Sequence, residues 1–282
     1  MTAHFDTFVM VDWSGGNDRG PRPKKDAIWV GVVRADGVAP PVYLRNRQVA
    51  EDWLSTLFQT ERRAARRVLV GFDFPFGYPT GVAAHVTGQA DPFSLWHWLE
   101  ARITDSPKAN NRWQVAGEMN ALFPGVGPFW GKLGHGEIEG LPRTKRALRG
   151  HGVKEWRQVE TATSGTFSVW QLAYAGAVGS QVLMGLPVLA RLRRRFGASV
   201  WPFEQPRGAL VMAEIWPSLL NAEVRERCAE TGGIRDAVQV ALMARAFAGL
   251  DETDLAEMLS IRSAEEGWIL GLGHEHRLRA AL

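Results

Sequence analysis

Short apolar runs separated by polar turns dominate the first part of the chain, and this pattern predicts strands. Residues 8–11 are wholly apolar and stop at Asp12, and residues 27–33 form a second apolar run. Asp36-Gly37 is a hairpin turn signal, and residues 41–44 predict a short third strand. We therefore expect the chain to open with a three-stranded antiparallel unit.

The next segments alternate between helical and strand patterns. Residues 49–67 carry an apolar stripe at helical spacing, and arginines crowd the end of this segment, where cations suit the helix dipole. A buried-type strand is predicted at 68–74 and another at 210–216, and helices are predicted at 218–230 and 234–248. This order of strands and helices predicts the α/β class.

Residues 74–165 carry little strand pattern and many glycines, so they predict helices and loops. We interpret them as a large helical insertion after the fourth strand, within a single domain that spans residues 1–282. Residues 142–195 hold ten basic and two acidic residues, a net charge of +8 in a chain whose net charge is +3. Such a block suits phosphate groups, although solvated arginines on helix surfaces are the simpler interpretation.

Composition narrows the classes of protein to consider. With 282 residues, of which 45% are hydrophobic and 22% charged, the chain can bury a full globular core. The single cysteine, Cys228, excludes a disulfide framework and a cysteine-based zinc site. No apolar run approaches membrane-spanning length, and the first residues lack the features of a signal peptide. We expect a soluble, cytoplasmic protein with no membrane partner.

Four carboxylates lie at positions that suggest chemistry. Asp12 ends the first strand, Asp73 ends the fourth, Glu214 lies inside the fifth, and Asp236 lies in the first turn of a late helix. A buried ionised carboxylate is costly unless it is paired or bound to a metal. Magnesium and manganese prefer oxygen ligands and keep several waters, so two or three converging carboxylates are sufficient to bind one.

Each of these carboxylates also has a purely structural interpretation. Asp12 could accept hydrogen bonds from the glycine-rich turn that follows it, and Asp73 could cap the backbone beside a proline. Asp236 suits a helix N-terminus without any ligand. Glu214, with apolar neighbours on both sides, is either a fourth acid of the site or a buried acid paired with an arginine.

This layout resembles the ribonuclease H-like superfamily, and most closely an uncharacterised bacterial family of predicted nucleases with that fold. The resemblance rests on four short segments in a fixed order: Val11-Asp12, Gly71-Phe-Asp-Phe-Pro75, Glu214-Ile-Trp-Pro217 and Arg235-Asp236-Ala237. It implies a mixed five-stranded sheet of order 3-2-1-4-5 with flanking helices. It also implies that Asp12, Asp73 and Asp236 gather as catalytic residues at one end of that sheet. Together with Glu214 they would bind Mg²⁺ or Mn²⁺.

The function that the resemblance implies is metal-dependent hydrolysis of phosphodiester bonds in DNA or RNA. The candidate substrate-binding residues are Trp130, Arg143, Lys145 and Arg146, because aromatic rings beside cations can stack on bases while the charges hold phosphates. For most tryptophans of the insertion, a role in the insertion's own core is the simpler interpretation. The alternative function is a non-catalytic scaffold of the same fold that binds a nucleotide or another protein.

A short Arg–acid motif, Arg157-Gln-Val-Glu160, has two interpretations. It resembles a signature of the same bacterial family, which would place Glu160 behind the site. A surface ion pair is the more ordinary prediction for these two residues.

Overall fold

The computed structural model describes residues 4–145 and 150–282. The chain divides into two compact units. Unit 1 comprises Met1–Phe74, Leu192–Arg262 and Trp268–Leu282, and unit 2 comprises Pro75–Arg191 and Ser263–Gly267. The predicted insertion thus falls almost entirely inside unit 2, which continues beyond residue 165 and includes a short return segment near the C-terminus.

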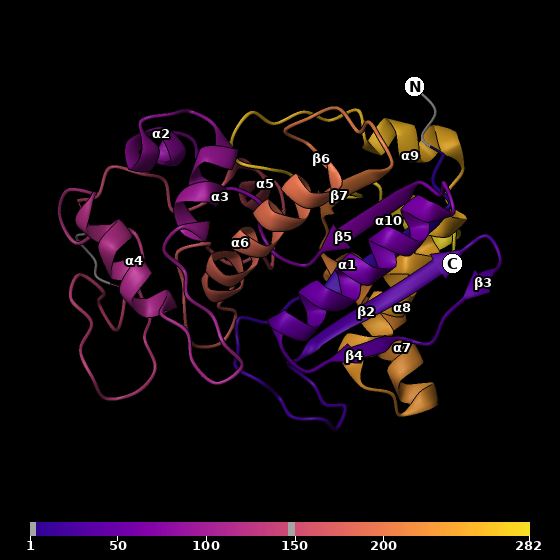
Figure 1. The fold of residues 1–282 in the computed structure, drawn as a ribbon, viewed down its shortest axis with the longest axis horizontal. Helices are drawn as coiled ribbons and strands as arrows, with labels where there is room; N and C mark the ends of the chain where they lie inside the picture. The colour runs from indigo at the N-terminus through magenta and orange to yellow at the C-terminus, as the bar shows by residue number, and fades with distance from the viewer. Residues whose placement is uncertain (1–3, 146–149) are drawn as a thin grey trace. The chain divides into compact units, whose positions relative to one another are not determined.

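Unit 1 contains a mixed sheet of seven strands (Figure 1). The order is β3-β2-β1-β5-β7-β6, and β4 also pairs with β2. The strands are β1 (Thr7–Asp12), β2 (Ile28–Arg34), β3 (Gly37–Val38), β4 (Val42–Leu44), β5 (Val68–Phe72), β6 (Ser199–Val200) and β7 (Leu210–Glu214). Strand β1 pairs antiparallel with β2 and parallel with β5, and β5 pairs parallel with β7. The α/β class and the mixed sheet are therefore confirmed.

The five strands that the sequence predicts correspond to β1, β2, β4, β5 and β7, and they are neighbours in the order β4-β2-β1-β5-β7. Strands β3 and β6 were not predicted. Each has only two residues, which is too short for a periodic pattern to identify.

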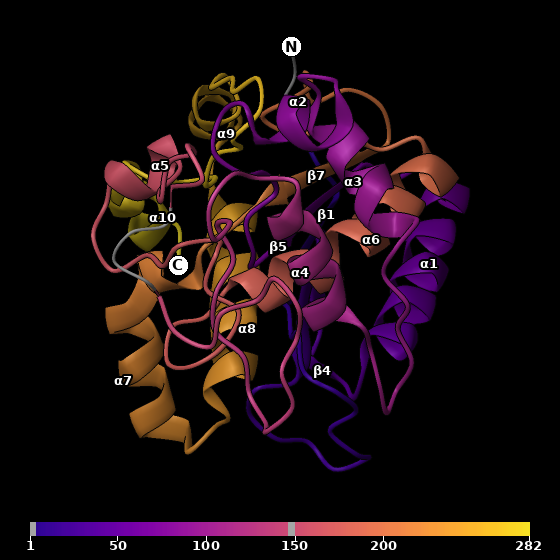
Figure 2. The same ribbon diagram turned by 90° about the vertical axis from the view of Figure 1, so that its left-hand side faces the viewer.

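Helices cover both faces of this sheet. Helix α8 (Arg235–Gly249) packs across β1 and β2, and α1 (Arg47–Arg63) lies on the opposite face (Figure 2). The other helical elements of unit 1 are η1 (Pro217–Leu220), α7 (Asn221–Thr231), α9 (Glu252–Met258) and α10 (Glu275–Ala280). Because both faces are covered, β1 and β5 are apolar runs without an alternating polar face.

A glycine in β2 allows the close approach of α8. A Cβ atom at Gly31 would overlap with the backbone carbonyl of Val240 in that helix. We expect Gly31→Ala to lower the free energy of unfolding by about 1–3 kcal/mol, because backbone cannot move aside as a flexible side chain can. Urea denaturation measures this change. Gly136→Ala is the matched control, since a Cβ there meets nothing within 4 Å; equal losses in the two variants would contradict the packing argument.

Unit 2 is built from short helices joined by long glycine-rich loops. Its helices are α2 (Val82–Thr87), α3 (Pro92–Glu100), α4 (Arg112–Ala121) and α5 (Gln158–Thr161), and α6 (Gly179–Phe196) runs from this unit into unit 1. Its core is aromatic: Tyr78 packs against Phe129 and Trp170, with ring centroids 5.9 and 5.0 Å away. Trp96 is also buried, as the interpretation of a tryptophan core predicts.

None of the helices in the described part of the chain has both the length and the apolar character needed to cross a membrane.

Candidate functional site

Two of the predicted aspartates lie next to each other at one end of the sheet. Val11 of β1 is in register with Phe72 of β5, and the two strands are parallel. The backbone N–H of Asp73 donates to the carbonyl of Val11 at 2.9 Å, which continues this pairing by one step. Asp12 and Asp73 therefore lie side by side at the C-terminal ends of two neighbouring parallel strands.

The third aspartate reaches the same place from a helix. Asp236 lies in the first turn of α8, which packs on β1 and β2. Its Oδ2 accepts a hydrogen bond from the backbone N–H of Asp26 at 2.6 Å. Asp26 lies just before β2 and has a positive φ of 55°. This bond fixes the start of α8 to the end of the sheet where Asp12 lies.

We define the carboxylate cluster as Asp12, Asp73 and Asp236, with Asp26 beside them. Burial raises the pKa of Asp12 well above its usual range, and the charges of Asp73, Asp236 and Asp26 raise it further. Burial, followed by the charges of Glu214 and Asp236, raises the pKa of Asp73 to about 7. Asp12, Asp73 and Asp236 thus lie within electrostatic reach of one another.

Among the residues that the structure describes, no cation balances the two strand-end acids. Among the described residues, neither the Asp12 nor the Asp73 carboxyl group forms an ion pair or a hydrogen bond with a side chain or a backbone N–H. Such an arrangement of like charges disfavours ionisation of all its members at once. It is the pattern expected where a bound cation supplies the missing positive charge.

Buried aromatic side chains pack around this end of the sheet, and they leave Asp12 and Asp73 half-buried. Trp13, Phe72 and Phe74 flank the two aspartates in sequence and are all buried. The Trp13 ring lies 6.1 Å from Phe72 and 5.9 Å from Phe74, measured between centroids. This apolar packing is the physical cause of the burial contribution to both pKa values.

Glu214 is more deeply buried than the cluster. Its exposed fraction is 2%, and it is in register with Phe72 at the end of β7. Its backbone carbonyl accepts from the N–H of Leu270 at 2.9 Å, so the chain around Leu270, in the last segment of unit 1, lies against the end of β7. The charge of Glu214 raises the pKa of Asp73. A fourth acid of the site and a buried structural acid both agree with this placement.

The cluster provides only carboxylate oxygens, which are the donors that magnesium and manganese prefer. Its chemistry therefore fits a hard divalent cation. The side chains of the cluster do not converge as a complete set of metal ligands. Among the described residues, no group of three acidic, histidine or cysteine side chains could hold a metal ion. Two carboxylates are sufficient for an ion that keeps several waters.

Sequence reasoning missed Asp26, although the sequence contains a signal for it. Strands β1 and β2 are antiparallel, with Asp12 opposite Trp29, so the residues before β2 must lie beside the end of β1. An acid three positions before Trp29 is therefore close to Asp12. Asp26 itself lies 3.8 Å from Arg19 in an exposed ion pair.

Three of the four candidate substrate-binding residues, Trp130, Arg143 and Lys145, are described, and they lie in unit 2. Trp130 is half-buried, and its indole N–H has no hydrogen-bond partner among the described residues. Arg143 is exposed and donates to the carbonyl of Gly134. Lys145 forms an ion pair with Glu155 at 3.2 Å, which partly neutralises it. Arg146 lies outside the described residues.

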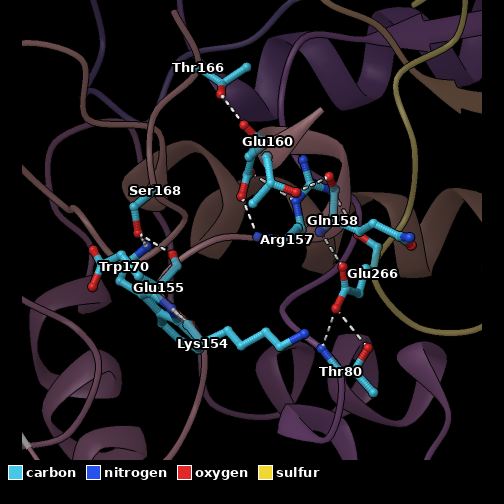
Figure 3. Close-up of polar contacts among 11 residues, drawn as sticks. Thr80, Lys154, Glu155, Arg157, Gln158, Glu160, Thr166, Ser168, Trp170 and Glu266 are labelled. Carbon is cyan, nitrogen blue, oxygen red and sulfur yellow. Dashed lines mark hydrogen bonds and ion pairs between the residues drawn. The ribbon is translucent and has the colours of Figure 1, made fainter. Parts of the chain in front are cut away.

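The predicted ion pair between Arg157 and Glu160 forms, but its predicted place at the surface is wrong, because the two residues are buried, with exposed fractions of 1% and 5%. The Arg157 Nε donates to Glu160 at 2.9 Å, and its Nη1 donates to the carbonyl of Glu266 at 2.8 Å. Figure 3 shows that the Glu266 carboxylate in turn accepts from Thr80 and from the backbone of Gln158. The motif holds the 263–267 return segment within unit 2, a role that only the tertiary structure reveals.

The raised pKa of Asp73 makes stability depend on pH. Between the usual aspartate pKa near 4 and about 7, the folded protein binds more protons than the unfolded chain, so the free energy of unfolding falls as pH rises. We expect Asp73→Asn to raise the free energy of unfolding by about 1–3 kcal/mol at pH 8 and by little at pH 4. Urea denaturation at both pH values tests this. Asp36→Asn, an exposed loop variant, is the control; an Asp73→Asn protein no more stable than wild type at pH 8 would contradict the repulsion.

Comparisons of this chain with protein-family models, with curated proteins and with solved structures find no match.

Proposed function

We propose that the carboxylate cluster is the centre of a divalent-metal-dependent phosphodiesterase that acts on DNA or RNA, carried by a ribonuclease H-like fold. The observation that carries this proposal is the meeting of Asp12, Asp73 and Asp236, with no cation among the described residues on the two strand-end acids. The buried aromatic rings around the two strand ends raise the cost of that repulsion. A bound cation would remove it.

The residues of the cluster have distinct parts in this proposal. Asp12, whose pKa responds to three other acids, is the central ligand, and Asp73 is its neighbour on β5. Asp236 is held in place by the Asp26 N–H and would be the third residue to hold the ion. A magnesium or manganese ion bound there would activate water and stabilise the leaving oxygen of a phosphodiester.

Recognition of the nucleic acid is assigned to unit 2. Arg143, Lys145 and Arg146 belong to the basic block of residues 142–195, and Trp130 offers an aromatic ring to a base. Binding through phosphate charge weakens steeply as salt rises. The affinity for nucleic acid is therefore expected to fall with salt, and Mn²⁺ binding to the carboxylate cluster is expected to change much less.

The test combines binding and cleavage by the full chain. Calorimetry with MnCl₂ should show binding, and labelled DNA and RNA, single- and double-stranded, should be cleaved with Mn²⁺ or Mg²⁺ but not after addition of EDTA. Absence of both binding and cleavage would refute the proposal. That result would favour the alternative, a non-catalytic scaffold, with which the lack of a converged three-ligand group among the described residues also agrees.

A further inference from the structure

Unit 2 contains a cavity with a volume of about 560 Å³, within the range typical of small-molecule sites. Two cations, Lys132 and Arg143, line it together with one acid, Glu137. The remaining wall is partly apolar and includes Val126 and Leu141. The cavity thus has two positively charged side chains and one negatively charged side chain in a wall that is partly apolar.

The two cations have no acidic partner in the described part of the chain. Lys132 is 5% exposed, and its Nζ donates to the carbonyl of Gly136; Arg143 donates to the carbonyl of Gly134. No carboxylate of the described residues lies within 4.0 Å of either cation, and residues 146–149 contain no acid. A buried ammonium group that meets only neutral carbonyls gains much by binding an anion.

Hydrogen bonds to backbone carbonyls hold together the two segments that carry the cations. The Tyr174 hydroxyl lies 3.2 Å from the carbonyl of Lys132 and 3.2 Å from that of Arg143, and it can donate to either. The N–H of Gly131 donates to the carbonyl of Pro142 at 3.0 Å, next to both cations. The backbones of the two segments are therefore held side by side, so both side chains start from the same part of the cavity wall.

The loop that now accepts from the two cations has room to move. A Cβ atom at Gly134 or at Gly136 would meet nothing within 4 Å, so neither position is packed against the rest of the unit. Ligand oxygens can replace these carbonyls without breaking a packed core. The site then exchanges neutral acceptors for charged ones, which form stronger hydrogen bonds.

We propose that this cavity binds a phosphomonoester of mononucleotide size. A phosphomonoester carries a charge of about −1.5 to −2 at neutral pH, which matches two cations, whereas a phosphodiester carries only one negative charge. The apolar wall gives the organic part of the ligand a surface to cover. The inference rests on unit 2 alone and holds whether or not the carboxylate cluster binds a metal.

Calorimetry on the full chain in EDTA tests this with adenosine 5′-monophosphate as the probe. Adenosine and the phosphodiester of two adenosines are the comparison ligands. We expect the monophosphate to bind, the diester to bind at least about tenfold more weakly, and adenosine not to bind measurably. Equal binding of monophosphate and diester would overturn the assignment to a monoester, and no binding of the monophosphate would overturn the site itself. Because EDTA excludes metal, neither result bears on the proposed cleavage activity.

Variants of the lining residues locate the binding. Arg143→Gln, at an exposed position, is expected to weaken monophosphate binding by about tenfold or more. Glu137→Gln should tighten it several-fold, because the single acid of the lining repels the ligand. Arg63→Gln, an exposed arginine of unit 1, is the matched control for loss of one charge. Unchanged affinity in both Arg143→Gln and Glu137→Gln would place the ligand elsewhere and refute the inference.

Discussion

Replacing Asp12 with asparagine is expected to reduce cation-dependent phosphodiester cleavage by more than about a hundredfold while the protein stays folded. Even groups that only support metal ligands are worth roughly 10–100-fold in affinity or activity, and Asp12 is proposed as the central ligand. Asparagine keeps the shape of the side chain but loses its charge and one acceptor oxygen. Initial rates of cleavage at saturating Mn²⁺, with calorimetry for Mn²⁺ binding, measure the effect.

Stability separates a loss of chemistry from a loss of folding. Because Asp12 is repelled by Asp73, Asp236 and Asp26, removing its charge should leave the free energy of unfolding unchanged or higher at pH 8. Asp36→Asn, which removes one charge from an exposed loop, is the control and should cleave like the wild type. Normal magnesium-dependent cleavage by the Asp12→Asn protein would show that the carboxylate cluster is not the catalytic centre.

Much of unit 1 could be predicted from sequence because its strands are buried on both faces. Strands of that kind are continuous apolar runs bounded by turn residues, and residues 8–11, 27–33 and 68–72 all have this form. The meeting of Asp12 and Asp73 could be predicted for the same reason, since two parallel neighbours end at the same edge of a sheet. Strands β3 and β6 could not, because two residues make no pattern.

The rest of the site depends on contacts that no local pattern encodes. Asp236 is fixed by the backbone N–H of Asp26, a residue 210 positions away in the chain. The buried Arg157 guanidinium donates to the carbonyl of Glu266, and a short Arg–acid motif alone gives no sign of that partner. Hydrophobic periodicity predicts which segments are buried, but it does not predict which buried polar groups form hydrogen bonds with one another.

A second buried acid lies at the other end of β1, and this acid forms ion pairs with two arginines. Glu61 of α1 is fully buried and accepts from Arg66 Nε at 2.5 Å and from the Thr7 hydroxyl at 2.8 Å. Arg34 of β2 completes the group at 2.9 Å. Burial by itself would raise the pKa of Glu61, but hydrogen bonds from Arg66, Thr7 and Arg34 outweigh it and hold the pKa below its usual range.

Glu61→Gln is therefore expected to lower the free energy of unfolding by about 2–4 kcal/mol at pH 7, because it removes the buried charged acceptor that two half-buried arginines and Thr7 share. The lowered pKa means that this stabilisation is complete above the unfolded glutamate pKa and is lost as pH falls through the folded one. The difference between variant and wild type should thus shrink below about pH 4. Urea denaturation from pH 3 to 7 measures it, with the exposed Glu226→Gln as the control.

The two ends of β1 then predict opposite behaviour from the same kind of substitution. At the Glu61 end, neutralising the acid should cost stability and leave the cation requirement of cleavage unchanged. At the Asp12 end, it should cost cleavage and leave stability unchanged or improved. The difference follows from the arginines that meet Glu61 and the lack of any described cation on Asp12. A Glu61→Gln protein as stable as wild type at pH 7 would show that the arginines beside this buried acid do not stabilise the fold, and would remove the contrast between the two ends of β1.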